Sequence, residues 1–354
     1  MKRLFTLVIL IGFGLWFFRA QYGSPAAPSH LSGPRNARTD MSLTALPYQK
    51  TLFVPYWQLD ESFHPSSDYD RYVYFGVAGS PQGINMSDPG YQKLQLFVDE
   101  TPHARWLTIR MTDSEVNDQI LEGTSSQQKI ISDAVAISQQ FGFEGVVLDF
   151  EYKTLFGEKV EAVTGFYRSF GETLHKKGLK TAVTVYGDVK YRSRPYDLRA
   201  IQSFVDEVMI MAYDLHKSRG EPGPNFPLSA GKLYGYGYDR LLKDILPIIP
   251  AEKLTVIFGM YGYDWKVDEQ KRPITVGESM TTAQITKNLI DDCPVERCTV
   301  LNDALSGETE INYVDDSGRL HIVWFENERS VQTKSALLKA NQINSYAFWA
   351  YGYF

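Results

Sequence analysis

The chain of 354 residues has a formal net charge of −6 and no long cluster of lysine and arginine, which argues against a nucleic-acid-binding protein. Its hydrophobic content of 44% supplies a globular core, and its length fits either one large barrel or two ordinary domains. Its many tyrosines and tryptophans have a flat apolar face and a polar edge, a shape that suits sugar rings, although most of them are expected to pack in the core.

The N-terminal segment 1–20 has the pattern of a signal peptide or of an N-terminal membrane anchor. Met1-Lys2-Arg3 is positively charged, and residues 4–18 form an almost unbroken apolar run. That run is shorter than the roughly 20 residues of a usual membrane span, so cleavage and retention as a membrane anchor both stay open. Residues 21–48 are rich in Pro, Ser, Gly and Ala and predict a flexible linker. In either case we expect residues 49–354 to lie outside the cytoplasmic membrane.

Strand-like and helix-like segments alternate along the rest of the chain, which favours an α/β fold and a parallel (β/α)8 TIM barrel. The eight predicted strands are 51–56, 72–78, 105–111, 145–151, 180–186, 207–213, 254–259 and 345–350. The predicted helices are 90–97, 125–140, 160–177, 196–204, 234–246 and 330–340.

The segment of about 266–322 breaks this alternation. It contains a helical piece near 282–289 and two short strand-like runs, 310–314 and 320–323, joined by a hairpin-type turn. We therefore predict a small α+β insertion between the seventh and eighth barrel strands.

The fourth predicted strand ends in two acids. Residues 142–152 read GFEGVVLDFEY, and Asp149 and Glu151 are two positions apart, so their side chains share one face. Two carboxyls in one site raise the pKa of one of them, which then acts as an acid near neutral pH. Such a proton donor is what glycoside hydrolysis requires. The alternative is an exposed acidic turn, but a buried strand between two helices favours a site at its carboxyl end.

This strand resembles the DGxDxDxE signature of glycoside hydrolase family 18, the chitinases and their relatives. Three later segments are similar to the sixth, seventh and eighth barrel strands of that family: Met211-Ala212-Tyr213-Asp214, residues 259–265 and Phe348-Trp349. Residues 321–330, HIVWFENERS, are similar to the bacterial branch that includes spore-cortex peptidoglycan hydrolases. The resemblance covers about residues 50–354.

The resemblance implies three catalytic residues. Glu151 would protonate the glycosidic oxygen, while the 2-acetamido oxygen of the sugar would act as the nucleophile. Asp149 would orient the acetamido N–H and stabilise the positive charge that develops on the cyclic intermediate, and Tyr213 would hydrogen-bond the acetamido oxygen.

Five further residues are candidates for binding the substrate: Asp214, Trp349, Trp57, Tyr261 and Glu326. Asp214 is almost as well explained as a helix cap and Trp349 as a core residue. Structural packing is the better explanation for Trp57, and for Glu326 an exposed position near a helix start is at least as good.

The implied activity is retaining cleavage of β-1,4 linkages next to N-acetylglucosamine, on peptidoglycan or chitin-like oligomers. We expect an N-acetylglucosamine-containing polysaccharide as the partner, no cofactor and a monomeric enzyme. A catalytically silent sugar-binding relative is the alternative, but such proteins usually lose the acid at the position of Glu151. A barrel that binds a metal through Asp149 and Glu151 is a further alternative, with few matching ligands at other strand ends.

The signature strand departs from the family pattern at two positions. Glu144 and Val147 stand where the family has its first two aspartates. Valine exchanges no proton and forms no hydrogen bond, so Asp149 needs another partner. The serine-glycine motif that chitinases carry on the third strand is also absent from residues 106–112. Both departures argue against crystalline chitin as the substrate.

The only two cysteines of the chain are Cys293 and Cys298, in the sequence DCPVERC. In an exported protein such a close pair is a candidate disulfide. Two cysteines without a nearby histidine are too few ligands for zinc, and the six histidines show no metal-binding spacing, so we expect no metal site.

Overall fold

The computed structural model describes residues 49–101, 104–152, 159–292 and 297–354. The predicted signal or anchor segment 1–20 and the predicted linker 21–48 lie outside these ranges. Within them, no helix is both long enough and apolar enough to cross a lipid bilayer.

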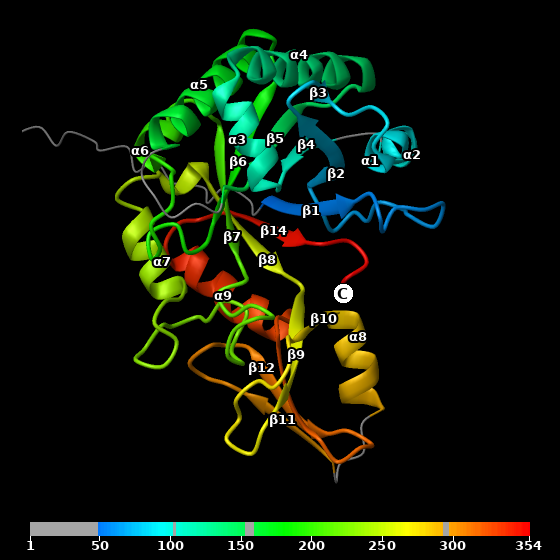
Figure 1. The fold of residues 1–354 in the computed structure, drawn as a ribbon, viewed down its shortest axis with the longest axis vertical. Coiled ribbons are helices and arrows are strands. Elements are labelled where there is room, and N and C mark those ends of the chain that lie inside the picture. The colour runs from blue at the N-terminus through cyan, green and yellow to red at the C-terminus, as the bar shows by residue number, and fades with distance from the viewer. Residues whose placement is uncertain (1–48, 102–103, 153–158, 293–296) are drawn as a thin grey trace, which may run out of the picture. The chain divides into compact units, whose positions relative to one another are not determined.

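Eight parallel strands close into a barrel, which confirms the predicted fold (Figure 1). Around the barrel the strand order is β1-β14-β8-β7-β6-β5-β4-β2, and pairing between β1 and β2 closes it. The bounds are β1 (Gln49–Pro55), β2 (Arg71–Ser80), β4 (Arg105–Met111), β5 (Gly145–Phe150), β6 (Lys180–Tyr186), β7 (Glu207–Ala212), β8 (Leu254–Gly259) and β14 (Ser345–Trp349). A two-residue strand, β3 (Gly83–Ile84), pairs with the end of β2.

The barrel strands are apolar on both faces because one face fills the barrel and the other meets the helices. All six residues of β5 are buried, for example, and so are all six of β8. The described helices outside the barrel are α1 (Pro89–Gln92), α2 (Leu94–Glu100), α3 (Ser114–Glu122), α4 (Thr124–Phe141), α5 (Val160–Lys176), α6 (Leu198–Ile201), α7 (Tyr238–Ile245) and α9 (Glu328–Ala340). This arrangement leaves the carboxyl ends of the strands as the place where side chains from several strands meet.

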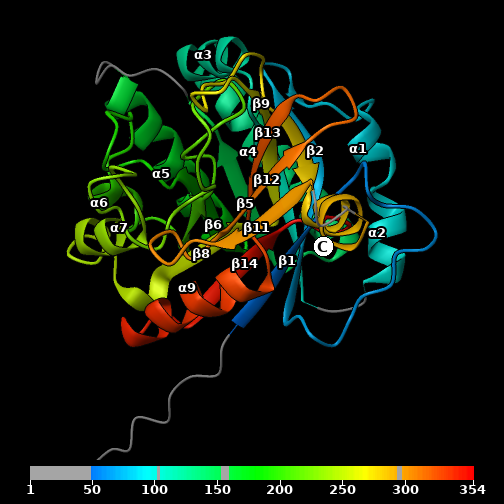
Figure 2. The ribbon, with the colours of Figure 1, turned by 90° about the horizontal axis from the view of Figure 1, so that it is seen from below.

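A second, antiparallel sheet is inserted between β8 and β14, in the strand order β10-β9-β13-β12-β11. Its strands are β9 (Tyr261–Val267), β10 (Glu278–Thr281), β11 (Cys298–Asn302), β12 (Thr309–Val314) and β13 (Leu320–Phe325), with α8 (Thr282–Ile285) and the π-helical turn Thr286–Asp291 beside them. Figure 2 views the molecule from the side of this sheet, whose strands pass in front of the barrel.

The inserted sheet is wider than the expected segment 266–322, because it begins at Tyr261 and ends at Phe325. The barrel strand stops at Gly259, and Met260 forms the bend, where its amide bonds the carbonyl of Trp349 at 2.7 Å. The sheet has two small apolar clusters of its own, one around Ile311 and Phe325 and one around Trp265 and Trp324. The inserted sheet is therefore a packed substructure with its own small core.

Candidate active site

A cavity of about 330 Å³ opens at the carboxyl ends of the barrel strands. Side chains from most of the barrel strands and from the start of the inserted sheet line it: Phe53, Trp57, Phe75, Arg110, Thr112, Asp149, Glu151, Thr184, Met211, Tyr213, Asp214, Ile257, Tyr261 and Trp349. The structure thus brings together every predicted catalytic and substrate-binding residue except Glu326.

The end of β5 is held firmly in place. The amide of Glu151 donates to the carbonyl of Met111 on β4 at 2.8 Å. The side chain of Asn117, on α3, donates to that same carbonyl at 2.8 Å and to the carbonyl of Glu151 at 2.9 Å. From the adjacent side, the Tyr196 hydroxyl donates to the carbonyl of Phe150 at 2.9 Å. Both carboxyls therefore project into the cavity from a fixed backbone.

Asp149 is only 3% exposed, and burial raises the pKa of its carboxyl to about 7. The nearby charge of Glu151 also contributes to this rise in pKa, while the hydroxyl of Thr184 and the charge of Arg110 oppose it. Thr184, on β6, donates a hydrogen bond to Asp149 Oδ1. This threonine is the partner that Asp149 lacks on its own strand, where buried Val147 replaces the family's aspartate.

Glu151 lies two positions further along and is partly exposed to the cavity. Its Oε2 accepts a hydrogen bond from the hydroxyl of Tyr186 at 2.9 Å. Burial and the charge of Glu151 raise the pKa of Tyr186, so this phenol stays a donor. Thr184 and Tyr186 are two positions apart on β6, as Asp149 and Glu151 are on β5, so each hydroxyl meets one acid.

A buried ion pair supports Tyr186 from behind. The guanidinium of Arg194 lies 4.1 Å from the centre of the tyrosine ring, and it bonds the carboxylate of Asp188 at 2.9 and 3.1 Å. Arg194 and Asp188 are both nearly inaccessible to solvent, at 6% and 7% side-chain exposure. This packing fixes the ring that in turn holds Glu151.

Tyr213 and Asp214 follow β7 and form the next part of the cavity wall. Burial, together with the charge of Asp149, raises the pKa of the Tyr213 phenol well above its usual value, so the phenol remains a neutral donor. Asp214 has a left-handed backbone, with φ of 61°, and its carboxylate accepts hydrogen bonds from the hydroxyls of Tyr261 and Tyr263. Lys217 lies 3.8 Å from the same carboxylate. Asp214 therefore joins the end of β7 to the inserted sheet.

Aromatic rings form the opposite wall of the cavity. The ring of Trp349 meets Phe75 edge to face at 4.6 Å between centroids and also contacts Phe53 and Trp57. Trp57 is 45% exposed, an unusually high fraction for a tryptophan that packs in a core. The cavity thus pairs a flat apolar wall with an acidic wall, a combination that suits a sugar ring.

Glu326 lies away from this cavity and is fully buried. Its carboxylate pairs with Lys334 of α9, which is also fully buried. The expectation that Glu326 lines the cleft, and the alternative that it is an exposed acid, both differ from the structure. Because the ammonium group of Lys334 balances its charge, the acid can be buried.

Three further residues of the site were not among the predicted site residues: Arg110, Thr184 and Tyr186. Arg110 stands beside Asp149 in the register of β4 and β5 and bonds Asp88 at 2.7 Å. A charged residue near the end of an apolar strand is a usable signal for Arg110, whereas threonine and tyrosine are ordinary strand residues.

Within the described ranges, no group of three or more histidine, cysteine, aspartate or glutamate side chains is arranged to hold a metal ion. The predicted disulfide involves Cys293, which lies outside the described residues, so this pairing stays a prediction.

Residues 111–353 match the family model described as glycosyl hydrolases family 18. Among curated proteins, an uncharacterized glycosylase, YvbX, of Bacillus subtilis is 27% identical over 245 residues, which cover 68% of this chain and 66% of that protein. A cortical fragment-lytic enzyme of Bacillus subtilis is 26% identical over 243 residues, which cover 67% of this chain and 53% of the relative. The chain thus spans only half to two thirds of the length of these relatives.

Solved structures share the fold. The spore cortex-lytic enzyme SleL of Bacillus cereus superposes with a TM-score of 0.67 at 20% identity, covering 87% of this chain and 72% of that one. A class V chitinase from Nicotiana tobaccum superposes with a TM-score of 0.75 at 16% identity, covering 86% and 94%. With the family model matched over most of the barrel and inserted sheet, the chain belongs to glycosyl hydrolases family 18.

Proposed function

We propose that this family 18 glycosidase is a retaining enzyme that cleaves β-1,4 linkages next to N-acetylglucosamine by substrate-assisted catalysis. The observation that carries the proposal is the position of Glu151, which is fixed to β4 through its amide and reaches into a cavity large enough for a sugar. Asp149 lies below it, and an aromatic wall that includes Trp349 faces it.

In the first step Glu151 protonates the glycosidic oxygen as the bond to the leaving sugar breaks. Tyr186 holds Oε2, while Oε1 accepts no hydrogen bond from the described residues and is free to face the substrate. Burial raises the pKa of Asp149 to about 7, so its carboxyl retains a proton near neutral pH. Asp149 passes this proton to Glu151, which lies on the same face of the strand end, and Glu151 delivers it to the glycosidic oxygen.

The acetamido oxygen of the sugar attacks the anomeric carbon in the same step and forms a cyclic oxazolinium ion. Asp149 accepts a hydrogen bond from the acetamido N–H, and its negative charge stabilises the cation once the shared proton has left. The neutral phenol of Tyr213 donates to the acetamido oxygen and orients it.

Glu151 then acts as a base in the second step. It removes a proton from water, the water oxygen bonds the anomeric carbon, and the ring of the intermediate opens to restore the acetamido group. Two inversions at one carbon leave its configuration unchanged, so the enzyme retains the anomeric configuration.

We further propose that the polymer is peptidoglycan or a chitin-like oligomer and that the enzyme works outside the cytoplasm. The names of its relatives refer to spore cortex fragments and to chitin. The apolar run at residues 4–18 supports export. The missing serine-glycine motif on the third strand favours short or soluble glycans over crystalline chitin.

The decisive experiment compares Glu151→Gln with Glu144→Gln, an identical change just before the opposite end of β5. We expect Glu151→Gln to release reducing ends from N-acetylglucosamine oligomers and peptidoglycan about 10²- to 10⁴-fold more slowly, and Glu144→Gln to match the wild type. Equal rates for Glu151→Gln and the wild type would refute the assigned acid. A thiazoline mimic of the cyclic intermediate should inhibit the wild type, and the absence of inhibition would argue against acetamido participation.

A further inference from the structure

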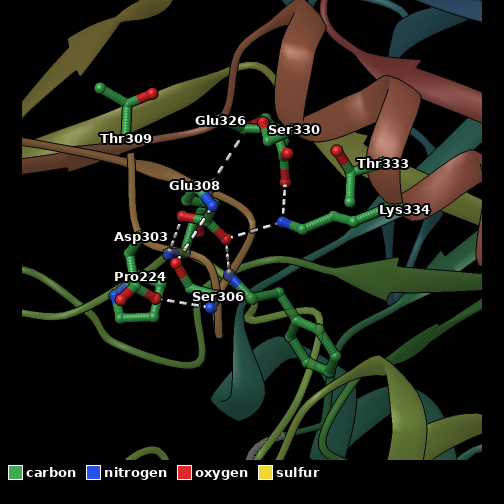
Figure 3. Close-up of polar contacts among 12 residues, drawn as sticks. Pro224, Asp303, Ser306, Glu308, Thr309, Glu326, Ser330, Thr333 and Lys334 are labelled. Carbon is green, nitrogen blue, oxygen red and sulfur yellow. Dashed lines mark hydrogen bonds and ion pairs between the residues drawn. The ribbon is translucent and has the colours of Figure 1, made fainter. Parts of the chain in front are cut away.

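Three fully buried ionisable side chains, Glu308, Glu326 and Lys334, meet outside the cavity (Figure 3). We call them the buried triad. The ammonium of Lys334 bonds Glu308 Oε1 at 2.7 Å and also bonds Glu326 Oε2. Burying three ionisable groups costs free energy unless each is paired and hydrogen-bonded, so the partners of each group matter.

The two acids of the triad have different surroundings. Besides Lys334, Glu308 accepts hydrogen bonds from the amides of Asn225 at 2.6 Å and of Phe226 at 2.8 Å. Glu326 Oε1, by contrast, has no hydrogen-bond partner among the described residues. Glu308 therefore links the inserted sheet to the loop between β7 and α7, whereas the side chain of Glu326 makes no hydrogen bond to that loop among the described residues.

Asn225 carries that link to the cavity wall. Its side-chain oxygen accepts the amide of Asp214 at 2.7 Å, and its carbonyl accepts the amide of Leu215 at 2.9 Å. Its side-chain nitrogen donates to the carbonyls of Gly259 at 3.1 Å and Tyr261 at 3.2 Å, on either side of the bend where the inserted sheet begins. One side chain thus fixes both segments that supply Asp214 and Tyr261 to the cavity.

The backbone of Asp214 explains why such a support is needed. Its left-handed conformation, with φ of 61°, is unfavourable for a residue with a side chain and persists only where neighbouring groups hold it. The bond from its amide to Asn225 is such a hold, and the hydroxyls of Tyr261 and Tyr263 hold its carboxylate.

We infer that Glu308 and Asn225 are positioning residues, through which the inserted sheet sets Asp214 and Tyr261 in the substrate-binding wall. The inference rests on the proposed function, since it assigns that wall to a sugar. It gives the inserted sheet a role in binding without any direct contact between the triad and the substrate.

The test compares Glu308→Gln with Glu326→Gln, the same change on the two acids that share Lys334. In Glu308→Gln the new side-chain NH2 group faces groups that are themselves donors, namely backbone amides of the loop and the ammonium of Lys334. This weakens the hold on the loop, so we expect faster hydrogen exchange at the amides of Asp214 and Leu215. We also expect KM for an N-acetylglucosamine tetramer to rise about 10- to 100-fold, because small displacements in a binding site are costly. Glu326→Gln should change neither quantity.

If Glu308→Gln only reduced the amount of folded protein, the apparent kcat would fall and KM would stay unchanged. A raised KM therefore distinguishes a role in positioning from a loss of stability. Unchanged exchange at Asp214 in Glu308→Gln would overturn the inference whatever the activity, and faster exchange with an unchanged KM would overturn the role in binding. If even the wild type cleaves no glycan, the proposed function fails, while the exchange measurement still decides whether Glu308 positions Asp214.

A double-mutant cycle gives the final control. If Glu308 acts through the segments of Asp214 and Tyr261, Glu308→Gln should raise KM by a smaller factor in the Asp214→Asn background than in the wild type. The combination of Asp214→Asn with Glu326→Gln should have the same KM as Asp214→Asn alone. Multiplied effects of Asp214→Asn and Glu308→Gln would show that the two residues act independently and would overturn the inference.

Discussion

Two places in this molecule hold a pair of carboxyls with strongly unusual surroundings. Asp149 and Glu151 end a barrel strand, whereas Glu308 and Glu326 lie beneath α9. In each pair, burial raises the pKa of one acid, Asp149 or Glu326, to about 7. A shifted pKa therefore does not by itself distinguish a catalytic site from a structural one.

Access and the type of partner make the difference. Neutral hydroxyls from β6 hold Asp149 and Glu151, and both acids line an open cavity. The other two acids are closed off from solvent and share an ammonium group. In the open cavity a carboxyl can exchange a proton with a substrate, whereas the acids that pair with buried Lys334 are closed off from any substrate and hold the chain together.

The strongest test of this contrast is Lys334→Met, which leaves two buried acids without their cation. We expect the free energy of unfolding to fall by about 3–5 kcal/mol in urea denaturation at neutral pH, the usual cost of breaking a buried ion pair from one side. Lys243→Met changes an exposed lysine of α7 and should cost less than about 0.5 kcal/mol. A similar small cost for both variants would mean that the triad does not contribute to stability in this way.

The pH dependence of stability provides a second test. Glu326 has a folded pKa near 7, above its ordinary value of 4.5, so the folded protein retains a proton that the unfolded chain releases. The stabilising contribution of this group is complete below pH 4.5 and is lost as the pH rises through about 7. Glu326→Gln removes that titration.

The free energy of unfolding of the wild type should therefore fall between about pH 5 and about pH 7 more steeply than that of Glu326→Gln, by up to about 1.4 kcal/mol per pH unit. The stability of Glu326→Gln should still fall somewhat with pH, because the pKa of Asp149 is also raised in the folded protein. Glu328→Gln alters an exposed acid of α9 and should leave the slope unchanged. Parallel curves for the wild type and Glu326→Gln would contradict the assignment.

The barrel was predictable because its strands are buried on both faces and therefore read as short apolar runs. The helix α3 (Ser114–Glu122) was missed, since it is short and mostly polar outside its buried face. The start of the inserted sheet was also misplaced: residues 259–265 read as one barrel strand. Tyr261–Val267 is half-exposed, and only the bend at Met260 separates it from β8.

The acids of the site were predictable from their spacing on one strand, and the aromatic wall from the resemblance. Their partners were not, because Thr184 and Arg110 meet Asp149 only through the pairing of neighbouring strands. Glu326 was misplaced for a related reason. Its burial depends on Lys334 and Glu308, which are brought to it by α9 and by the inserted sheet.

The smallest expected effect concerns the hydroxyl that replaces the family's second aspartate as the partner of Asp149. The hydrogen bond from Thr184 stabilises the ionised carboxyl and so lowers the pKa of Asp149 against the effect of burial. Thr184→Val removes it, and the pKa should rise by about one to two units.

Because the productive pair of acids carries one proton, kcat/KM of the wild type should fall as the pH rises above about 7. In Thr184→Val this fall should move to higher pH, so that the variant retains a larger share of its own maximum at pH 8 than the wild type does. Thr108→Val removes another buried barrel hydroxyl, one without a hydrogen-bond partner among the described residues, and should leave the profile in place. A basic limb that stays at the same pH in Thr184→Val would show that the proton lost there does not belong to the pair that includes Asp149.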